Sequence, residues 1–279
     1  PDLKSHVVED YDLGEVFSYI NPVMLYTRHL GFKGKFEDAL AAGDSKAAEL
    51  KGLVEEVEDE LIRHPDIRAK AVFRFFPAAA EGTRLLIQQS DFKSVAATFD
   101  FGRQQRDGGL CLSDYVLPLA EGRRDYIVMF ATTVGPGARG RAKGLEEEGA
   151  YLKSHITLAL AIEGAEAMAE ILHQKIRSMW GIGDKPEITK KELFQARYNG
   201  VRMSFGYPAC PRLEDQTQLF QLLEVHDKIG IELTEGFMMD PESSVSAMVF
   251  HHPEARYFSL SQADTEALEK RLSPATPGR

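Results

Sequence analysis

The sequence has little cysteine, no long apolar run and no excess of basic residues. Two cysteines, Cys111 and Cys210, occur among 279 residues, which is too few for a disulfide framework, and they lack the spacing of a structural metal site. No apolar run is long enough to cross a bilayer, and no signal peptide opens the chain. We therefore expect no membrane contact and a reducing, cytoplasmic location. The formal net charge of −10 leaves no basic stripe to neutralise phosphates, which argues against nucleic acid as a partner.

The composition is that of a globular protein. Hydrophobic residues make up 43% and charged residues 27% of the chain, enough to build a sizeable core. No internal repeat, low-complexity linker or clear boundary divides residues 1–279, so we expect one domain. Because the first residue is Pro1 and not methionine, we also expect this domain to be a piece of a longer polypeptide.

Hydrophobic periodicity and turn residues predict the order of helices and strands. Strands are expected at 71–76, 83–89, 95–101, 125–134, 243–251 and 257–262. Helices are expected after Asp12, over 21–31, 44–63 and 145–179, after Thr189, over 214–225, and from an Asp264 cap to 272, with 273–279 frayed. The long helix should face the sheet through an apolar stripe from Leu158 to Met179. This order predicts an α+β fold with a twisted, largely antiparallel sheet flanked by helices.

A glycine-rich stretch over 135–140 formally fits the dinucleotide-binding fingerprint. The helix after it is too long, however, and no strand with an acidic tip follows at the required interval. We interpret it as a strand-to-helix loop and the fold as non-Rossmann.

The most informative stretch runs over 202–211 and reads Arg-Met-Ser-Phe-Gly-Tyr-Pro-Ala-Cys-Pro. Pro208 and Pro211 stop both helix and central strand, while Gly206 permits close approach to the backbone. A rigid segment with an arginine at one end suits a ligand that has a carboxylate and a flat base. An ordered loop whose Tyr207 packs on the core is the alternative that these residues leave open.

The pattern Arg-x-x-x-Gly-Tyr-Pro-Ala-Cys-Pro resembles the signature of the activation domain of cobalamin-dependent methionine synthase. Other stretches resemble the same family in the same order: Tyr19-Ile20-Asn21, Phe76-Pro77-Ala78, Arg103-Gln104-Gln105, Asp125-Tyr126-Ile127, Trp180-Gly181, Leu222-Leu223-Glu224, Ile231-Glu232-Leu233-Thr234-Glu235, Ser244-Val245-Ser246, His252-Pro253 and Tyr257-Phe258. The resemblance therefore runs over nearly the whole chain.

The resemblance implies a module that binds S-adenosylmethionine and presents its methyl group for reductive methylation of cob(II)alamin. The cobalamin would be carried by a cobalamin-binding domain of the same methyltransferase, since this chain lacks an Asp-x-His-x-x-Gly motif. A flavodoxin-like protein or diflavin reductase would supply the electron. Such chemistry needs positioning more than acid–base groups. We accordingly predict no catalytic and no metal-ligating residue in this chain.

The site residues that the resemblance implies lie in four parts of the chain. Arg202 would bind the ligand carboxylate, the backbone from Gly206 to Ala209 the base, and Tyr207 and Tyr257 would form walls. Asn21 and Glu166 would face the cationic half of the ligand. The full predicted set is Asn21, Glu166, Arg202, Ser204, Gly206, Tyr207, Pro208, Ala209, Tyr257 and Phe258.

Several of these positions have a purely structural alternative. Asn21 replaces an aspartate usual in the family, and it also suits a helix N-cap. Glu166, Glu170, His173 and Arg177 recur at helical spacing, so pairing along one helix competes with ligand contact for Glu166 and is favoured for the others. The acidic run at 55–60 is expected to be a solvated face, His251 and His252 to pack in the core or a turn, and Cys210 to be unreactive.

Two other functions remain open at this point. A docking module that clamps a corrinoid protein but has lost S-adenosylmethionine binding is compatible with Asn21. A stand-alone enzyme acting on a small acid would have to turn over without cobalamin.

Overall fold

A computed structural model describes residues 2–273, and its centre is one antiparallel sheet. The sheet has seven strands in the order β4-β3-β2-β5-β9-β6, with β1 also paired to β2. The strands are β1 (Ser5–Tyr11), β2 (Ala69–Glu81), β3 (Arg84–Gln88), β4 (Val95–Asp100), β5 (Asp125–Thr133), β6 (Val201–Met203) and β9 (Ser244–Phe250), and a separate pair is formed by β7 (Glu232–Leu233) and β8 (Met239–Asp240). The predicted α+β, largely antiparallel fold is confirmed.

The strand β2 is longer than predicted and contains Pro77. β1 pairs with residues 69–74 of β2, and β3 pairs with residues 78–81. Pro77 therefore lies in a gap between two neighbours on the same edge of β2, which accommodates its missing N–H donor. β1 itself was not predicted, because its sequence has only a weak alternation of apolar and polar residues.

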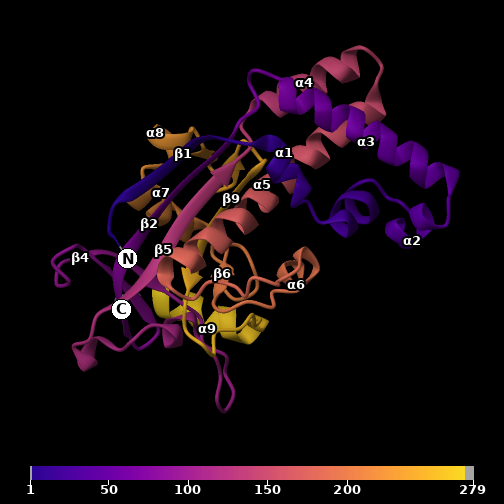
Figure 1. The fold of residues 1–279 in the computed structure, drawn as a ribbon. Coiled ribbons are helices and arrows are strands. Elements are labelled where there is room, and N and C mark those ends of the chain that lie inside the picture. The colour runs from indigo at the N-terminus through magenta and orange to yellow at the C-terminus, as the bar shows by residue number, and fades with distance from the viewer. Residues whose placement is uncertain (1, 274–279) are drawn as a thin grey trace, which may run out of the picture.

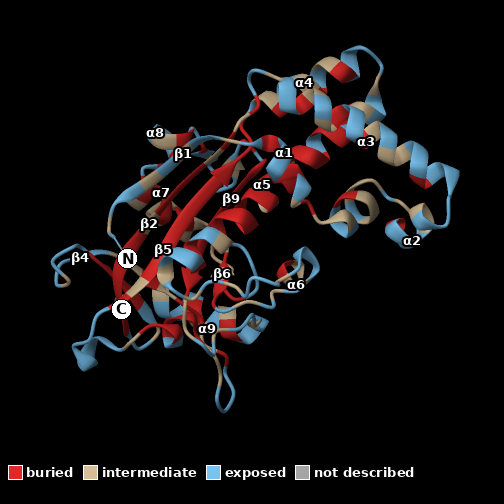
Figure 2. Ribbon diagram, viewed as in Figure 1, coloured by how far each residue is buried: buried red, intermediate tan, exposed pale blue. Residues whose placement is uncertain are grey.

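Helices cover both faces of the sheet, as Figure 1 shows. One face carries α1 (Leu13–Ser18), α3 (Ser45–Arg63) and α5 (Tyr151–Trp180), whose apolar side chains form one core with β2, β5 and β9. The other face carries α7 (Gln216–Leu223) and α8 (Val225–Ile229), which pack in a second core with β2–β5. The buried residues follow the central strands and α5 in Figure 2. The remaining helical segments are α2 (Phe36–Ala41), α4 (Gly137–Glu147), α6 (Lys190–Phe194), α9 (Gln262–Leu272), a π-helical turn η1 (Val23–His29), and the short 3₁₀ turns η2 (Leu112–Tyr115), η3 (Leu119–Glu121) and η4 (Leu213–Asp215).

The predicted helix over 145–179 is wrong in one respect, because it is two helices. α4 ends near Gly149, whose φ of +79° is left-handed, and α5 begins at Tyr151. α5 is also buried on most of its surface, so its buried face is wider than predicted. Of the residues in the predicted apolar stripe, only Leu158 and Met179 at its two ends are exposed. Of the described helices, none is both long enough and apolar enough to span a membrane.

Three further predictions need correction. Residues 257–262 are not a strand, because β6 already occupies the free edge of β9. The segment over 214–225 is divided at Glu224, which has φ +55°. Ser261 and not Asp264 caps α9; Asp264 is the third residue of a capping box. By contrast, Asp12 and Asp44 cap α1 and α3, and Thr189 caps α6, as predicted. Residues 274–279 lie outside the described part.

Candidate functional site

A pocket of about 430 Å³ lies where α5, β6 and the segment before α9 meet. Its lining residues come from three stretches of the chain: Glu166, then Arg202, Met203, Ser204, Tyr207, Pro208 and Ala209, and finally Tyr257, Phe258 and Ser259. Eight of the ten predicted site residues are thus brought together. Their number, and the opposite charges among them, make this the candidate binding site.

The segment after β6 folds as a pinned turn. Gly206 has φ +83°, its N–H donates to the carbonyl of Cys210 at 2.8 Å, and the Cys210 N–H returns to the carbonyl of Tyr207 at 2.9 Å. The Leu260 N–H donates to the carbonyl of Pro208 at 2.9 Å. That last bond draws the 257–259 segment against the turn, so two walls of the pocket are joined through backbone.

Two predicted residues do not line the pocket. Gly206 shapes the turn, and a Cβ there would lie 2.8 Å from Leu213 Cδ2. Asn21 accepts a hydrogen bond from the Val23 N–H at 3.0 Å, so its side chain caps the start of η1. The capping alternative for Asn21 is what the structure shows.

Arg202 lies between two carboxylates of α5 that are one turn apart. Its Nη1 donates to Glu170 Oε2 at 2.6 Å, and its Nη2 lies 3.7 Å from Glu166 Oε2. Burial lowers the pKa of Arg202, but the charges of Glu170, Tyr198 and Glu166 together outweigh burial and raise it. The nearby charge of Glu166, together with burial, raises the pKa of Tyr207. Arg202 is therefore a permanent cation facing a pocket with an acidic wall.

The predicted pairing along α5 is wrong, because its charged residues find partners on other segments. Arg177 donates to both carboxylate oxygens of Asp184, at 2.9 and 2.5 Å, and its guanidinium carbon lies 4.0 Å from the centre of the Tyr198 ring. His173 is fully buried between these groups, and burial holds its pKa well below the usual value. It is a neutral imidazole in contact with Tyr198.

Four residues at or near the pocket were not among the predicted site residues. Met203 and Ser259 line it, Glu170 bonds to Arg202, and the Tyr198 hydroxyl lies 3.4 Å from that of Tyr257. Met203 stands inside the signature stretch, so its position was available as a signal. Glu170 recurs with Glu166 at helical spacing, and Ser259 follows Phe258, so both also had a local signal. Tyr198 had none, because its partner Tyr257 is distant in sequence.

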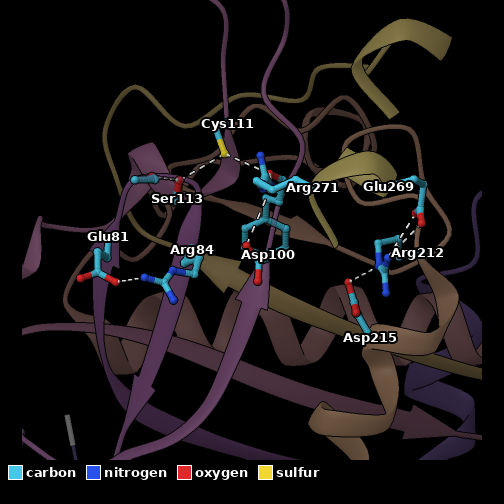
Figure 3. Close-up of polar contacts among 11 residues, drawn as sticks. Glu81, Arg84, Asp100, Cys111, Ser113, Arg212, Asp215, Glu269 and Arg271 are labelled. Carbon is cyan, nitrogen blue, oxygen red and sulfur yellow. Dashed lines mark hydrogen bonds and ion pairs between the residues drawn. The ribbon is translucent and has the colours of Figure 1, made fainter. Parts of the chain in front are cut away.

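The end of the signature stretch is held by Arg212, whose guanidinium contacts three carboxylates. Figure 3 shows two of them, Asp215 and Glu269. Glu214 and Asp215 follow it in the chain, and Glu269 comes from α9 at 3.2 Å. Burial raises the pKa of Asp215 to about 6 in spite of Arg212. α9 is thereby tied to the pocket-forming turn.

Other polar residues fit less well with an active centre. Burial raises the pKa of Cys210, which agrees with an unreactive thiol. His251 is not simply packed, since its Nε2 bonds to Asp125. Within residues 2–273, no group of three or more His, Cys, Asp or Glu side chains is placed to hold a metal ion.

The fold and pocket define an α+β module with a candidate small-ligand pocket beside an open antiparallel sheet. A family model described as "Vitamin B12 dependent methionine synthase, activation domain" matches residues 12–272, and the chain belongs to this family. Methionine synthase of Mycobacterium tuberculosis (strain ATCC 25618 / H37Rv) is 34% identical in an alignment over 205 residues, and the match covers 69% of this chain and 17% of that protein. The chain thus spans a small part of that relative.

A solved structure is similar over almost the whole fold. The crystal structure of the MetH reactivation domain bound to AdoHcy (S-adenosylhomocysteine) superposes with a TM-score of 0.88 at 29% identity. The similarity covers 96% of this chain and 86% of that one. The resemblance inferred from the signature stretch is confirmed at the level of the family and the fold.

Proposed function

We propose that the chain is the reactivation module of a cobalamin-dependent methionine synthase, a methyltransferase of methionine biosynthesis that uses 5-methyltetrahydrofolate and homocysteine. In this proposal the pocket binds S-adenosylmethionine and presents its methyl group for reductive methylation of cob(II)alamin held by another domain. The observation that carries the proposal is the placement of Arg202 and Glu166, of opposite charge, at one pocket with Tyr207 and Tyr257.

The residues present suit each part of the ligand. The Nε and Nη2 atoms of Arg202 donate no hydrogen bond to any residue in the described chain, so this edge can receive a carboxylate bidentately. The Glu166 side chain is 41% exposed and accepts no hydrogen bond from the described residues, so it can face an ammonium or sulfonium charge. The cavity volume falls within the range of small-molecule sites.

Bound S-adenosylmethionine supplies an electrophilic methyl group on a positively charged sulfur. When the methyl group is transferred, the rest of the ligand leaves as a neutral thioether and no proton has to move. The protein's task is therefore to bind the ligand and to orient its methyl group. The backbone over 206–209 and the two tyrosines would hold the base and ribose. Tyr207 is 58% exposed and Tyr257 is 50% exposed, so the mouth of the pocket is open to a partner domain.

The partners follow from the same proposal. They are the cobalamin-binding domain of the same enzyme and a flavodoxin-like or diflavin reductase electron donor. The two free cysteines are buried, which suits a reducing cytoplasm.

Isothermal titration with S-adenosylmethionine and AdoHcy tests ligand binding. Arg202→Ala should weaken both ligands by roughly 10- to 100-fold, because a charge-assisted bidentate contact is lost. Asp184→Asn, which alters a buried arginine–carboxylate pair away from this pocket, is the matched control. Equal affinities of the wild type and Arg202→Ala would remove Arg202 from the site.

A docking module without ligand binding remains the second candidate, because Asn21 is occupied as a cap and does not line the pocket. Association with a cobalamin domain, unchanged by S-adenosylmethionine and accompanied by no heat of ligand binding, would select it.

A further inference from the structure

Glu170 is a buried carboxylate that only partly satisfies its hydrogen-bonding capacity. Its side chain is 7% exposed and its Oε2 accepts the 2.6 Å bond from Arg202. The other oxygen, Oε1, is buried without a partner among the described residues, and so are both ring nitrogens of His173 one turn further along α5. A buried unpaired carboxylate oxygen costs stability. A role in stability alone therefore does not account for Glu170.

Arg202 has a competing partner at the pocket itself. Its Nη2 forms a loose ion pair with Glu166 Oε2 at 3.7 Å, and a small rotation of the guanidinium would shorten this contact to a hydrogen-bonded pair. Such a pair would occupy both the cation that suits a ligand carboxylate and the anion that suits a ligand ammonium. The bond from Nη1 to Glu170 holds the opposite end of the guanidinium and opposes this rotation.

The far side of Arg202 offers no alternative anchor. Arg177 stacks on Tyr198 and is committed to Asp184, whose side chain is 4% exposed. His173 is neutral and lies among the same side chains. Arg202 has ion-pair contacts with Glu170 and Glu166 in the described chain. If Glu170 is removed, Glu166 is the carboxylate that remains in contact with Arg202.

We propose that Glu170 is a positioning residue, which fixes Arg202 so that its Nε/Nη2 edge faces the pocket and prevents the loose Arg202–Glu166 ion pair from closing to a direct hydrogen bond. This inference rests on the proposed function, because the edge so presented is the one assigned to the ligand carboxylate. It adds a residue that touches no ligand and acts only through Arg202.

Glu170 also has an effect that opposes ligand binding. Glu170 carries a negative charge and would repel the ligand carboxylate. That charge is already compensated by Arg202 at 2.6 Å, whereas loss of the anchor changes the direction of all the donors of the guanidinium. Positioning therefore dominates, and removal of Glu170 should weaken binding.

The test compares two ligands by titration calorimetry. AdoHcy carries the amino-acid group and 5′-methylthioadenosine does not. Glu170→Ala should raise the Kd for AdoHcy roughly tenfold and leave the Kd for methylthioadenosine unchanged. Adding Glu166→Gln to Glu170→Ala should recover part of the lost AdoHcy affinity, whereas Glu166→Gln alone should weaken it. Such a change of sign is not expected from a merely structural role.

Controls separate the possible failures. Asp184→Asn disturbs a comparable buried pair and should lower stability while both affinities stay unchanged. If Glu170→Ala does not fold, Glu170→Gln should show the same selective loss with a smaller size. Equal or tighter AdoHcy binding by the Glu170 variants, or an equal loss for both ligands, overturns the positioning role. Absence of AdoHcy binding by the wild type instead refutes the proposed function.

Discussion

The Nε2 atom of His251, just after β9, lies 2.8 Å from Oδ1 of Asp125, the first residue of β5. The other carboxylate oxygen of Asp125 accepts the Leu117 N–H at 2.8 Å, and Oδ1 also accepts the Tyr126 N–H. Burial opposes ionisation, but these hydrogen bonds outweigh it and lower the pKa of Asp125. The hydrogen bond joins the ends of two adjacent strands of the sheet, and the His251 ring packs against Trp180.

Asp125→Asn should lower the free energy of unfolding by about 2 kcal/mol at pH 7, because an amide cannot accept all three donors. Since the folded pKa of Asp125 is depressed, its contribution is present above the unfolded pKa of about 3.9 and is lost as the pH falls below it. In urea unfolding, the free energy of unfolding of the variant should therefore differ from that of the wild type strongly at pH 7 and only slightly at pH 3. A constant difference would contradict this assignment.

Glu58 on α3 should have the opposite pH dependence. Burial, followed by the charges of Glu55 and Asp59, raises its pKa to about 7. The folded pKa exceeds the unfolded value, so stability is lost as the pH rises from about 4 through 7. Glu58→Gln should therefore stabilise the protein by about 1 kcal/mol at pH 8 and by little at pH 4. The gain at pH 8 is modest because solvent screens the charges around this partly exposed side chain. Glu37→Gln, at an exposed position on α2, is the control and should show no such trend.

Gly206→Ala should destabilise the turn that carries Tyr207. A residue at φ +83° costs about 1 kcal/mol, and the added Cβ would also meet Leu213. Gly230 has φ +73° and open space, so Gly230→Ala incurs the backbone cost alone. We expect a loss of about 2 kcal/mol at 206 against about 1 at 230, and reduced AdoHcy affinity only for Gly206→Ala. Matching effects of the two variants would show that the turn adjusts freely.

Arg212→Ala should release α9 from the signature turn. Asp215 then stays buried without its cation, and its pKa, already about 6, rises further. Because this pKa is raised, the loss of stability should reach about 1–2 kcal/mol at pH 8 and should shrink as the pH falls through about 6, where Asp215 becomes protonated in both folded proteins. Hydrogen exchange over 262–272 should become faster. Arg84→Ala, which removes the exposed pair with Glu81 seen in Figure 3, should leave stability within about 0.5 kcal/mol and exchange in α9 unchanged.

The predicted helices and strands were most accurate where the physical signal is local. The caps Asp12, Asp44 and Thr189 lie where short-range side-chain bonds dictate them. The failures occur where a distant segment decides. Residues 257–262 have the residue types of a strand, but their backbone bonds go to Gln104 and Pro208 and not to a strand edge.

The site shows the same division. The signature stretch pointed to Arg202 and Tyr207, and eight of the predicted residues share one pocket. The link between Arg202 and Glu170 could not be predicted, because these residues are 32 positions apart and α5 is buried on nearly all sides. The spacing along the helix instead suggested that Glu170 pairs with other residues of α5.

The sequence by itself determined the antiparallel α+β plan and the rigid turn after Arg202, because periodicity, caps and prolines act within a few residues. Only the tertiary structure decided which carboxylate anchors that arginine and which segments close the pocket. Ion pairs and backbone bonds between β6, α5 and the approach to α9 depend on how the sheet stacks distant parts of the chain, and no local pattern encodes that arrangement.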